Sequence, residues 1–173
     1  MGIPKDISAI FNFPPMPSLG PESRESNLNI NQCKKRTAAA LENAGIEGIE
    51  GNLILSAALL WHDYLDESHT ISQSIHTQAG SYLHGIMHRR EPDYSNAKYW
   101  FYKSGSYSCY GMLSGKLETI LDNTSLASLA EGRWDPFAMV DAVSRTEPDT
   151  DEYELLQKVQ NAEFQTLLEE TFS

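Results

Sequence analysis

The sequence has few cysteines, a shortage of basic residues and no long hydrophobic run, and each of these excludes a class of protein. Two cysteines, Cys33 and Cys109, are too few and too far apart for a disulfide framework or a zinc knuckle, and predict reduced thiols. Thirteen Lys and Arg against 24 Asp and Glu give a net charge of −11, which disfavours binding to nucleic acid.

The hydrophobic segments are also too short to cross a bilayer. The longest of them, residues 53–61, is far below the length of a membrane span, so no membrane partner is expected. The first residues lack the basic stretch and apolar core of a secretory signal. Together these features predict a soluble cytoplasmic protein.

Residues 1–29 differ in composition from the rest of the chain. We expect them to form an extended arm, because prolines at this density interrupt regular helix. The arm is also apolar, with Ile7, Ile10 and Phe11, so it should lie in a groove of its own domain or of a partner subunit. A homo-oligomer formed through the arm is therefore one of two alternatives. The arm holds five of the eight prolines: Pro4, Pro14, Pro15, Pro17 and Pro21.

Residues 30–173 predict a single compact all-α domain. Apolar residues recur at helical spacing, caps and stop signals separate the segments, and no strand alternation appears. The segment from residue 53 is apolar on nearly every side, which predicts a central helix that can continue to residue 76. The expected helices cover residues 31–44, 53–76, 80–91, 95–104, 112–121, 136–143 and 151–171.

All five histidines lie between residues 62 and 88, which marks this segment as the candidate site. Imidazole titrates near neutral pH and binds transition metals. On one continuous helix, His62, Asp66, His69, Gln73 and His76 would form a single line. That line is either the wall of a cleft or a solvated helix face. His62 and His69 would be about 10 Å apart, too far to share one metal ion.

A second helix carries His84 and His88 one turn apart. Such a pair can chelate a divalent ion such as zinc, and Glu91 follows on the same side. Either histidine can also serve as a general base. Gly85, between them, is costly inside a helix, and indicates a close approach of a ligand or, more often, of another helix.

Cations follow the histidines directly. Four cations lie within 15 residues of a chain that is acidic as a whole: Arg89, Arg90, Lys98 and Lys103. Arginine beside imidazole suits the carboxylate or phosphate of a small anionic ligand. The alternative is pairing within the chain. Aromatic side chains gather here as core or as pocket walls: Tyr82, Tyr94, Tyr99, Trp100, Phe101 and Tyr102.

The run from Ser68 to Phe101 resembles the central motif of a family of small uncharacterised bacterial and fungal proteins. The motif reads SHxxSQ, then GSxxHGxxHRREPD, then NAxYWF, and all three parts are present here. After Phe101 the chain departs from the family, with Tyr102 and Lys103 in place of two arginines. The family has no established activity, so the resemblance implies a shared site and not a named reaction.

The sequence thus predicts a helical domain with a small-molecule pocket, acting as a metal-dependent or general acid–base enzyme. His69, His84 and His88 are the candidate catalytic residues, and His84 and His88 the candidate metal ligands. The alternative is a non-catalytic helical scaffold or interaction module in which the histidines are structural. Further candidates for contacts to a ligand are Arg89, Asp66, Glu91, Asp93, Gln73 and Ser81.

Overall fold

The computed structural model describes residues 2–12 and 14–173, and within these ranges the chain is helical without strands. The prediction of an all-α fold is therefore confirmed for the described part of the protein. None of its helices is long and apolar enough to cross a membrane. The elements are α1 (Lys5–Ile10), α2 (Ile30–Ala44), α3 (Gly48–Trp61), α4 (Leu65–Ser72), α5 (Gln78–Arg90), α6 (Tyr94–Ser104), α7 (Tyr110–Leu121), η1 (Ala127–Ala130), α8 (Pro136–Arg145) and α9 (Asp151–Thr171).

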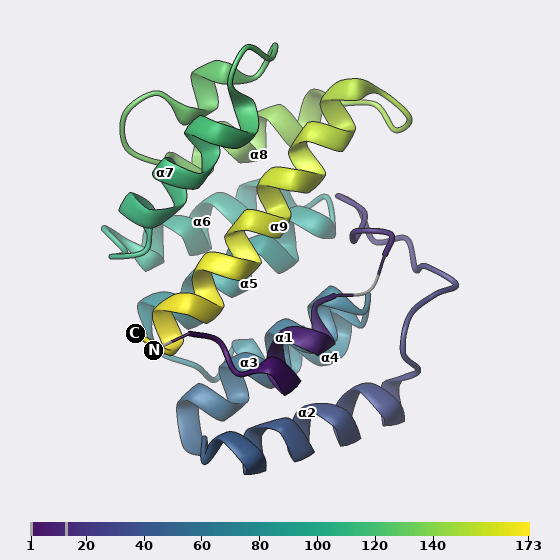
Figure 1. Ribbon diagram of the computed structural model, residues 1–173. Helices are drawn as coiled ribbons and strands as arrows, with labels where there is room; N and C mark the ends of the chain where they lie inside the picture. The colour runs from purple at the N-terminus through teal and green to yellow at the C-terminus, as the bar shows by residue number, and fades with distance from the viewer. Residues whose placement is uncertain (1, 13) are drawn as a thin grey trace.

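Successive helices from α2 to α6 pack side by side, and α8 continues this series against α6. The long helix α9 crosses the assembly and contacts α3, α7 and α8, with α2 on the opposite side of the molecule from α7 and α8 (Figure 1). Helix α3 is buried on more than one face, as its composition predicts, since Ile54, Leu59 and Leu60 are all fully buried. The core therefore lies around α3, α5 and α9.

Helix boundaries agree with the capping residues in the sequence. Asn29 and Gln32 form a capping box at the start of α2, and Gly45 ends that helix with a positive φ of 67°. Asp93 caps α6 by accepting a hydrogen bond from the backbone N of Asn96. Asp135 caps α8, which begins at Pro136.

The extended arm predicted over residues 1–29 is interrupted by α1, although residues 1 and 13 lie outside the described residues. Helix α1 fits between Pro4, its N-cap, and the prolines from Pro14 onward, so the prolines limit its length without preventing it. Ile7 is fully buried and Ile10 nearly so, within their own domain. These two side chains thus pack on the chain they belong to, as in the first of the two alternatives.

The predicted continuous helix through residue 76 is wrong, because the chain turns between α3 and α4. Asp63 has a left-handed φ of 68°, a conformation that Asp adopts more readily than most residues. Its carboxylate accepts hydrogen bonds from the backbone N and Nε of Arg24, both at 2.9 Å, and from Nη2 of Arg90 at 2.7 Å. Two arginines from distant parts of the chain stabilise this turn. The sequence has no glycine or proline at the turn that would indicate the end of the helix.

Gly85 serves helix packing, as the more frequent explanation for a mid-helix glycine predicts. A Cβ atom built on Gly85 would lie 2.7 Å from the ring of Phe101 in α6. Helices α5 and α6 therefore approach each other closely at this point. That approach brings Trp100 and Asn96, which precede Phe101 on α6, beside His84 and His88.

We predict that Gly85→Ala lowers the free energy of unfolding by about 1–3 kcal/mol, because the added methyl group overpacks against Phe101. Urea denaturation measures the change. Gly115→Ala, in the interior of α7 where a Cβ meets no atom within 4 Å, is the matched control. It should raise stability by about 0.5–1 kcal/mol. Equal effects of the two substitutions would contradict close packing at Gly85.

Candidate functional site

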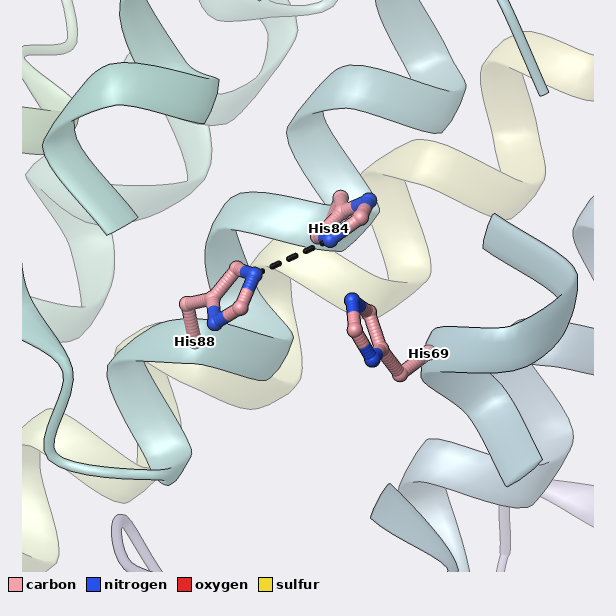
Figure 2. Close-up of side chains that lie close together, drawn as sticks. All are labelled: His69, His84 and His88. Carbon is pink, nitrogen blue, oxygen red and sulfur yellow. Dashed lines mark hydrogen bonds between the residues drawn. The ribbon is translucent and has the colours of Figure 1, made fainter. Parts of the chain in front are cut away.

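Three of the five histidines meet at the interface of α4 and α5. His69 comes from α4, and His84 and His88 come from α5, with one ligand atom of each lying within 4.8 Å of the others. Figure 2 shows the three rings directed toward one another from the two helices. The Nε2 atoms of His84 and His88 are 3.0 Å apart. We call these three residues the histidine cluster.

Local sequence determines how the two helices present these rings. Thr77 caps α5 by accepting a hydrogen bond from the backbone N of Gly80 at 3.0 Å, so His84 and His88 follow on one face. On α4, Ser56 of α3 donates to the backbone oxygen of Ser68 at 2.9 Å and also contacts its hydroxyl. This buried contact fixes α4 at the residue before His69.

The other two histidines lie outside the cluster. His62 caps the end of α3, and its Nε2 lies 2.9 Å from the backbone oxygen of Ile10, which ties α1 to the core. His76 is exposed in the turn before α5. The single line of polar groups expected on one long helix therefore does not form, and the turn at Asp63 is the cause.

Trp100 of α6 covers one side of the cluster. Its ring stacks on His84 with centroids 3.9 Å apart and planes at 11°, and His84 is almost completely buried. Among the aromatic residues of this region, Trp100 is the one in ring contact with the cluster, which composition alone did not single out. Stacking fixes the orientation of the His84 ring.

Glu91 and Asn96 contact His88. Nδ1 of His88 lies 3.1 Å from Oε2 of Glu91. Because an ionised carboxylate only accepts, Nδ1 carries the proton and the Nε2 lone pair faces the cluster. The amide nitrogen of Asn96 is 3.4 Å from Nδ1 and 3.2 Å from Nε2 of His88. Because Nε2 is the unprotonated nitrogen, the Asn96 amide donates to its lone pair, and a bound ion would have to displace this contact.

Burial favours the uncharged form of two members of the cluster, His84 and His88. Desolvation, followed by the neighbouring His88 and His69, lowers the pKa of His84 to about 3. Burial also lowers the pKa of His88, although the carboxylates of Glu91 and Asp93 act in the opposite direction. Nδ1 of His84 is buried without a hydrogen-bond partner. Neutral imidazoles are the form that binds metal.

The cluster has the donor set and spacing of a transition-metal site. Zinc binds imidazole nitrogen at about 2.0–2.1 Å, so two ligands of a tetrahedral ion lie about 3.3 Å apart. The spacings within the cluster, from 3.0 Å to at most 4.8 Å, bracket this value. Small side-chain rotations are therefore enough to place all three nitrogens around one ion.

Arg89 does not lie at the cluster, although the sequence suggested it there. It is completely buried between α5 and α9, where Nη2 contacts Oε2 of Glu163 at 2.5 Å and Nη1 contacts Oε1 at 3.1 Å. Tyr82 donates to the same carboxylate at 2.7 Å. Arg90 is equally buried and pairs with Asp63. Both arginines therefore pair within the chain, which is the alternative to binding an anionic ligand.

The remaining candidates have different surroundings. Asp66 and Gln73 are exposed on or beside α4, and Gln73 donates to the backbone oxygen of Thr70. Asp93 caps α6 while also influencing His88 electrostatically. Ser81 is buried on the α5 face that carries His84 and His88. Of the predicted ligand-contacting residues, Glu91 is the one that directly contacts the cluster.

The prominent cavities of the described chain lie away from the cluster. One of about 560 Å³ lies between α7 and α9 and includes Lys116 and Lys158. Another, of about 240 Å³, lies between α1 and α2 beside Arg36. The pocket that the sequence predicted around the histidines is not one of these. The cluster is instead a tightly packed site, half-buried on the side of His69.

We predict that the metal-free protein loses stability as pH falls from 7 to 5, in part through His84. The unfolded chain gains a proton on this imidazole near pH 6.5, whereas the folded protein does so only near pH 3. Unfolding is therefore favoured as pH falls through this range. His84→Asn should make the stability-versus-pH slope shallower, as measured by urea denaturation in chelator-treated buffer. His76→Asn, at an exposed position, should retain the wild-type slope.

We also predict that Glu163→Gln lowers the free energy of unfolding by about 3–5 kcal/mol, because it leaves the Arg89 charge buried without a counterion. Thermal or urea denaturation measures the loss. Glu169→Gln removes the partly exposed pair with Lys116 and should change stability by less than about 1 kcal/mol. A comparable loss in both variants would show that burial does not determine the strength of the Arg89 pair.

Comparison with protein families, with curated proteins and with solved structures finds no match to this chain. Its function therefore has to be argued from the residues of the histidine cluster.

Proposed function

We propose that the protein binds one divalent transition-metal ion, zinc first among the candidates, through His69, His84 and His88. The observation that carries this proposal is the convergence of three imidazole nitrogens, from two helices, within 4.8 Å. Imidazole is a preferred ligand of zinc and of neighbouring transition metals. Three protein nitrogens leave one coordination position open, the arrangement of catalytic rather than structural zinc sites.

The state of the three imidazoles without metal supports this assignment. His88 has its Nε2 lone pair directed inward, and His84 places its own Nε2 at hydrogen-bond distance from it. His84 then has a buried Nδ1 with no partner, which is unfavourable in a packed interior. An ion bound through Nε2 of His84 would move the ring proton to Nδ1, so its bonds to the three rings would have to outweigh the loss of the His84–His88 contact.

The function that follows is that of a metal-dependent enzyme that activates water. A metal ion lowers the pKa of a bound water toward neutrality, which yields a nucleophile at physiological pH. His69 is half-buried, so an ion held by the cluster would be nearest to solvent on the α4 side. Because the packed cluster is not part of the prominent cavities, the reaction class is hydrolysis or hydration of a small or protruding group.

The family resemblance is part of this proposal. The three histidines, Glu91 and Trp100 all belong to the motif that the chain shares with that family. Residues of the same motif also include Arg89 and Arg90, which stabilise the fold through buried ion pairs. The motif would then preserve a metal site together with the packing that holds it.

Surroundings and partners complete the proposal. We place the protein in the cytoplasm, with a small molecule as its substrate and without a nucleic-acid partner, given the net charge of −11. Assembly of copies through residues 1–29 is a weaker expectation, because Ile7 and Ile10 are already buried within the same chain. A small anionic ligand held by Arg89 is likewise weakened, because Arg89 is paired with Glu163.

The second candidate function is the non-catalytic scaffold, and His62 favours it. That histidine is buried and its ring contacts the backbone of α1, which shows that this chain does use imidazole to join helices. In a scaffold the cluster would be a further contact between α4 and α5. The two functions differ in one measurable property, the binding of a metal ion.

The decisive experiment is a zinc titration of chelator-treated protein by calorimetry, with metal content measured after dialysis. We expect one ion per chain in the wild type, and a loss of affinity of roughly 100-fold or more in His69→Ala, His84→Ala and His88→Ala. Zinc at 100 times its dissociation constant should stabilise the wild type by about 2.7 kcal/mol.

The control is His76→Ala, which removes an exposed histidine outside the cluster and should bind like the wild type. A wild-type protein that binds none of zinc, cobalt, nickel or manganese would reject the metal site and favour the scaffold. Equal binding by His76→Ala and His84→Ala would place any bound ion elsewhere.

A further inference from the structure

We propose that Glu91 is the positioning residue of this centre: it orients His88 toward the ion, and with Asp93 it makes the open coordination position select against anions. The inference rests on the proposed metal site and adds the class of ligand that the site accepts. That class is an uncharged small molecule.

The backbone at the end of α5 holds Glu91 in place. Its backbone N donates to the oxygens of Met87 at 3.1 Å and His88 at 3.2 Å, and the backbone N of Asp93 donates to His88 at 3.0 Å. The Glu91 side chain is 30% exposed, and its Oε2 lies 3.1 Å from Nδ1 of His88. The carboxylate therefore lies on the outer side of the ring, away from the other two histidines.

This contact determines which nitrogen of His88 can bind metal. Nδ1 donates its proton to Glu91, so Nε2 carries the lone pair, and Nε2 is the atom 3.0 Å from His84 and 3.2 Å from the Asn96 amide. Carboxylates in this outer position fix the tautomer of a histidine ligand and increase its basicity. Trp100 orients His84 by stacking, whereas Glu91 orients His88 by a hydrogen bond.

Apart from the proposed ion, the charged side chains that act on the cluster are carboxylates. Glu91 and Asp93 both act on His88. The nearby cations are engaged elsewhere: Arg89 with Glu163, Arg90 with Asp63 and Lys98 with Asp141. A divalent ion with three neutral imidazoles and these two carboxylates sums to zero charge. An anion approaching the ion is thus also repelled by two carboxylates, and a neutral ligand is not.

The test uses the cobalt-loaded full-length protein, because the visible spectrum of cobalt reports coordination directly. The variants are Glu91→Gln, Glu91→Ala and the control Glu118→Gln, which alters an exposed glutamate on α7. Glu91→Ala should bind cobalt roughly 10–100-fold more weakly than the wild type. Glu91→Gln should stay close to the wild type, because its amide oxygen can still accept the Nδ1 proton.

The ligand class is tested by titrating the same proteins with azide, an anion, and with free imidazole, a neutral ligand. Glu91→Gln should bind azide roughly tenfold more tightly than the wild type, because one negative charge near the ion is lost. Imidazole should bind both proteins equally. A purely structural role for Glu91 would not change the ratio of azide to imidazole affinity.

The outcomes separate this inference from the metal site. Cobalt binding by the wild type together with unchanged affinities in both Glu91 variants would overturn the role of Glu91 and leave the metal site intact. Azide affinity equal in Glu91→Gln and wild type would overturn the selection against anions. Failure of the wild type to bind cobalt or zinc would overturn both proposals.

Discussion

The ion pair between Arg89 and Glu163 is the interaction on which the rest of this structure depends. Both side chains are completely excluded from solvent, and they join α5 to α9 across the centre of the molecule. Glu163 also accepts from Tyr82, whose hydroxyl accepts from the indole nitrogen of Trp134 at 3.0 Å. A buried charge is tolerated only with such partners, so these contacts specify how α5 is rotated.

That rotation places the histidine cluster. With Arg89 directed toward α9, helical geometry directs His84 and His88 toward α4 and α6. Gly85 then allows α6 to approach, and Trp100 stacks on His84 as a result. Arg90 extends the same arrangement by pairing with Asp63, which lies in the turn between α3 and α4. Three consecutive residues thus make three different contacts. His88 belongs to the cluster, Arg89 pairs with α9, and Arg90 pairs with the turn between α3 and α4.

Much of the fold could be predicted from the sequence, because its signals are local. Caps such as Asn29, Asp93 and Asp135, and the stop at Gly45, lie directly next to the ends of the helices they delimit. Helix α1 and the turn at Asp63 could not be predicted in this way. The turn depends on Arg24 and Arg90, which lie 39 and 27 residues away from it.

The site was predicted in part for the same reason. His84 and His88 lie on one helix, so their spacing in the sequence predicted that they share a face. The motif that the chain shares with the family also contains His69 and Glu91. The partner of Arg89 was not visible, because Glu163 lies 74 residues further on and no local pattern connects them. The sequence did not distinguish Trp100 from the other aromatic residues of this region. Its contact with His84 depends on the close approach of α5 and α6 at Gly85.

The histidine cluster is drawn from a single short stretch of chain, residues 69–88, whereas the central ion pair joins distant segments. Closing a loop of this length has a small entropic cost, so α4 and α5 can come together early in folding, and the docking of α9 onto Arg89 then fixes how α5 presents its two rings. A chain still being synthesised has therefore already produced every proposed ligand when α9 has yet to emerge. The proposed ligands are thus synthesised together, whereas the site that they would form is complete only once α9 has docked.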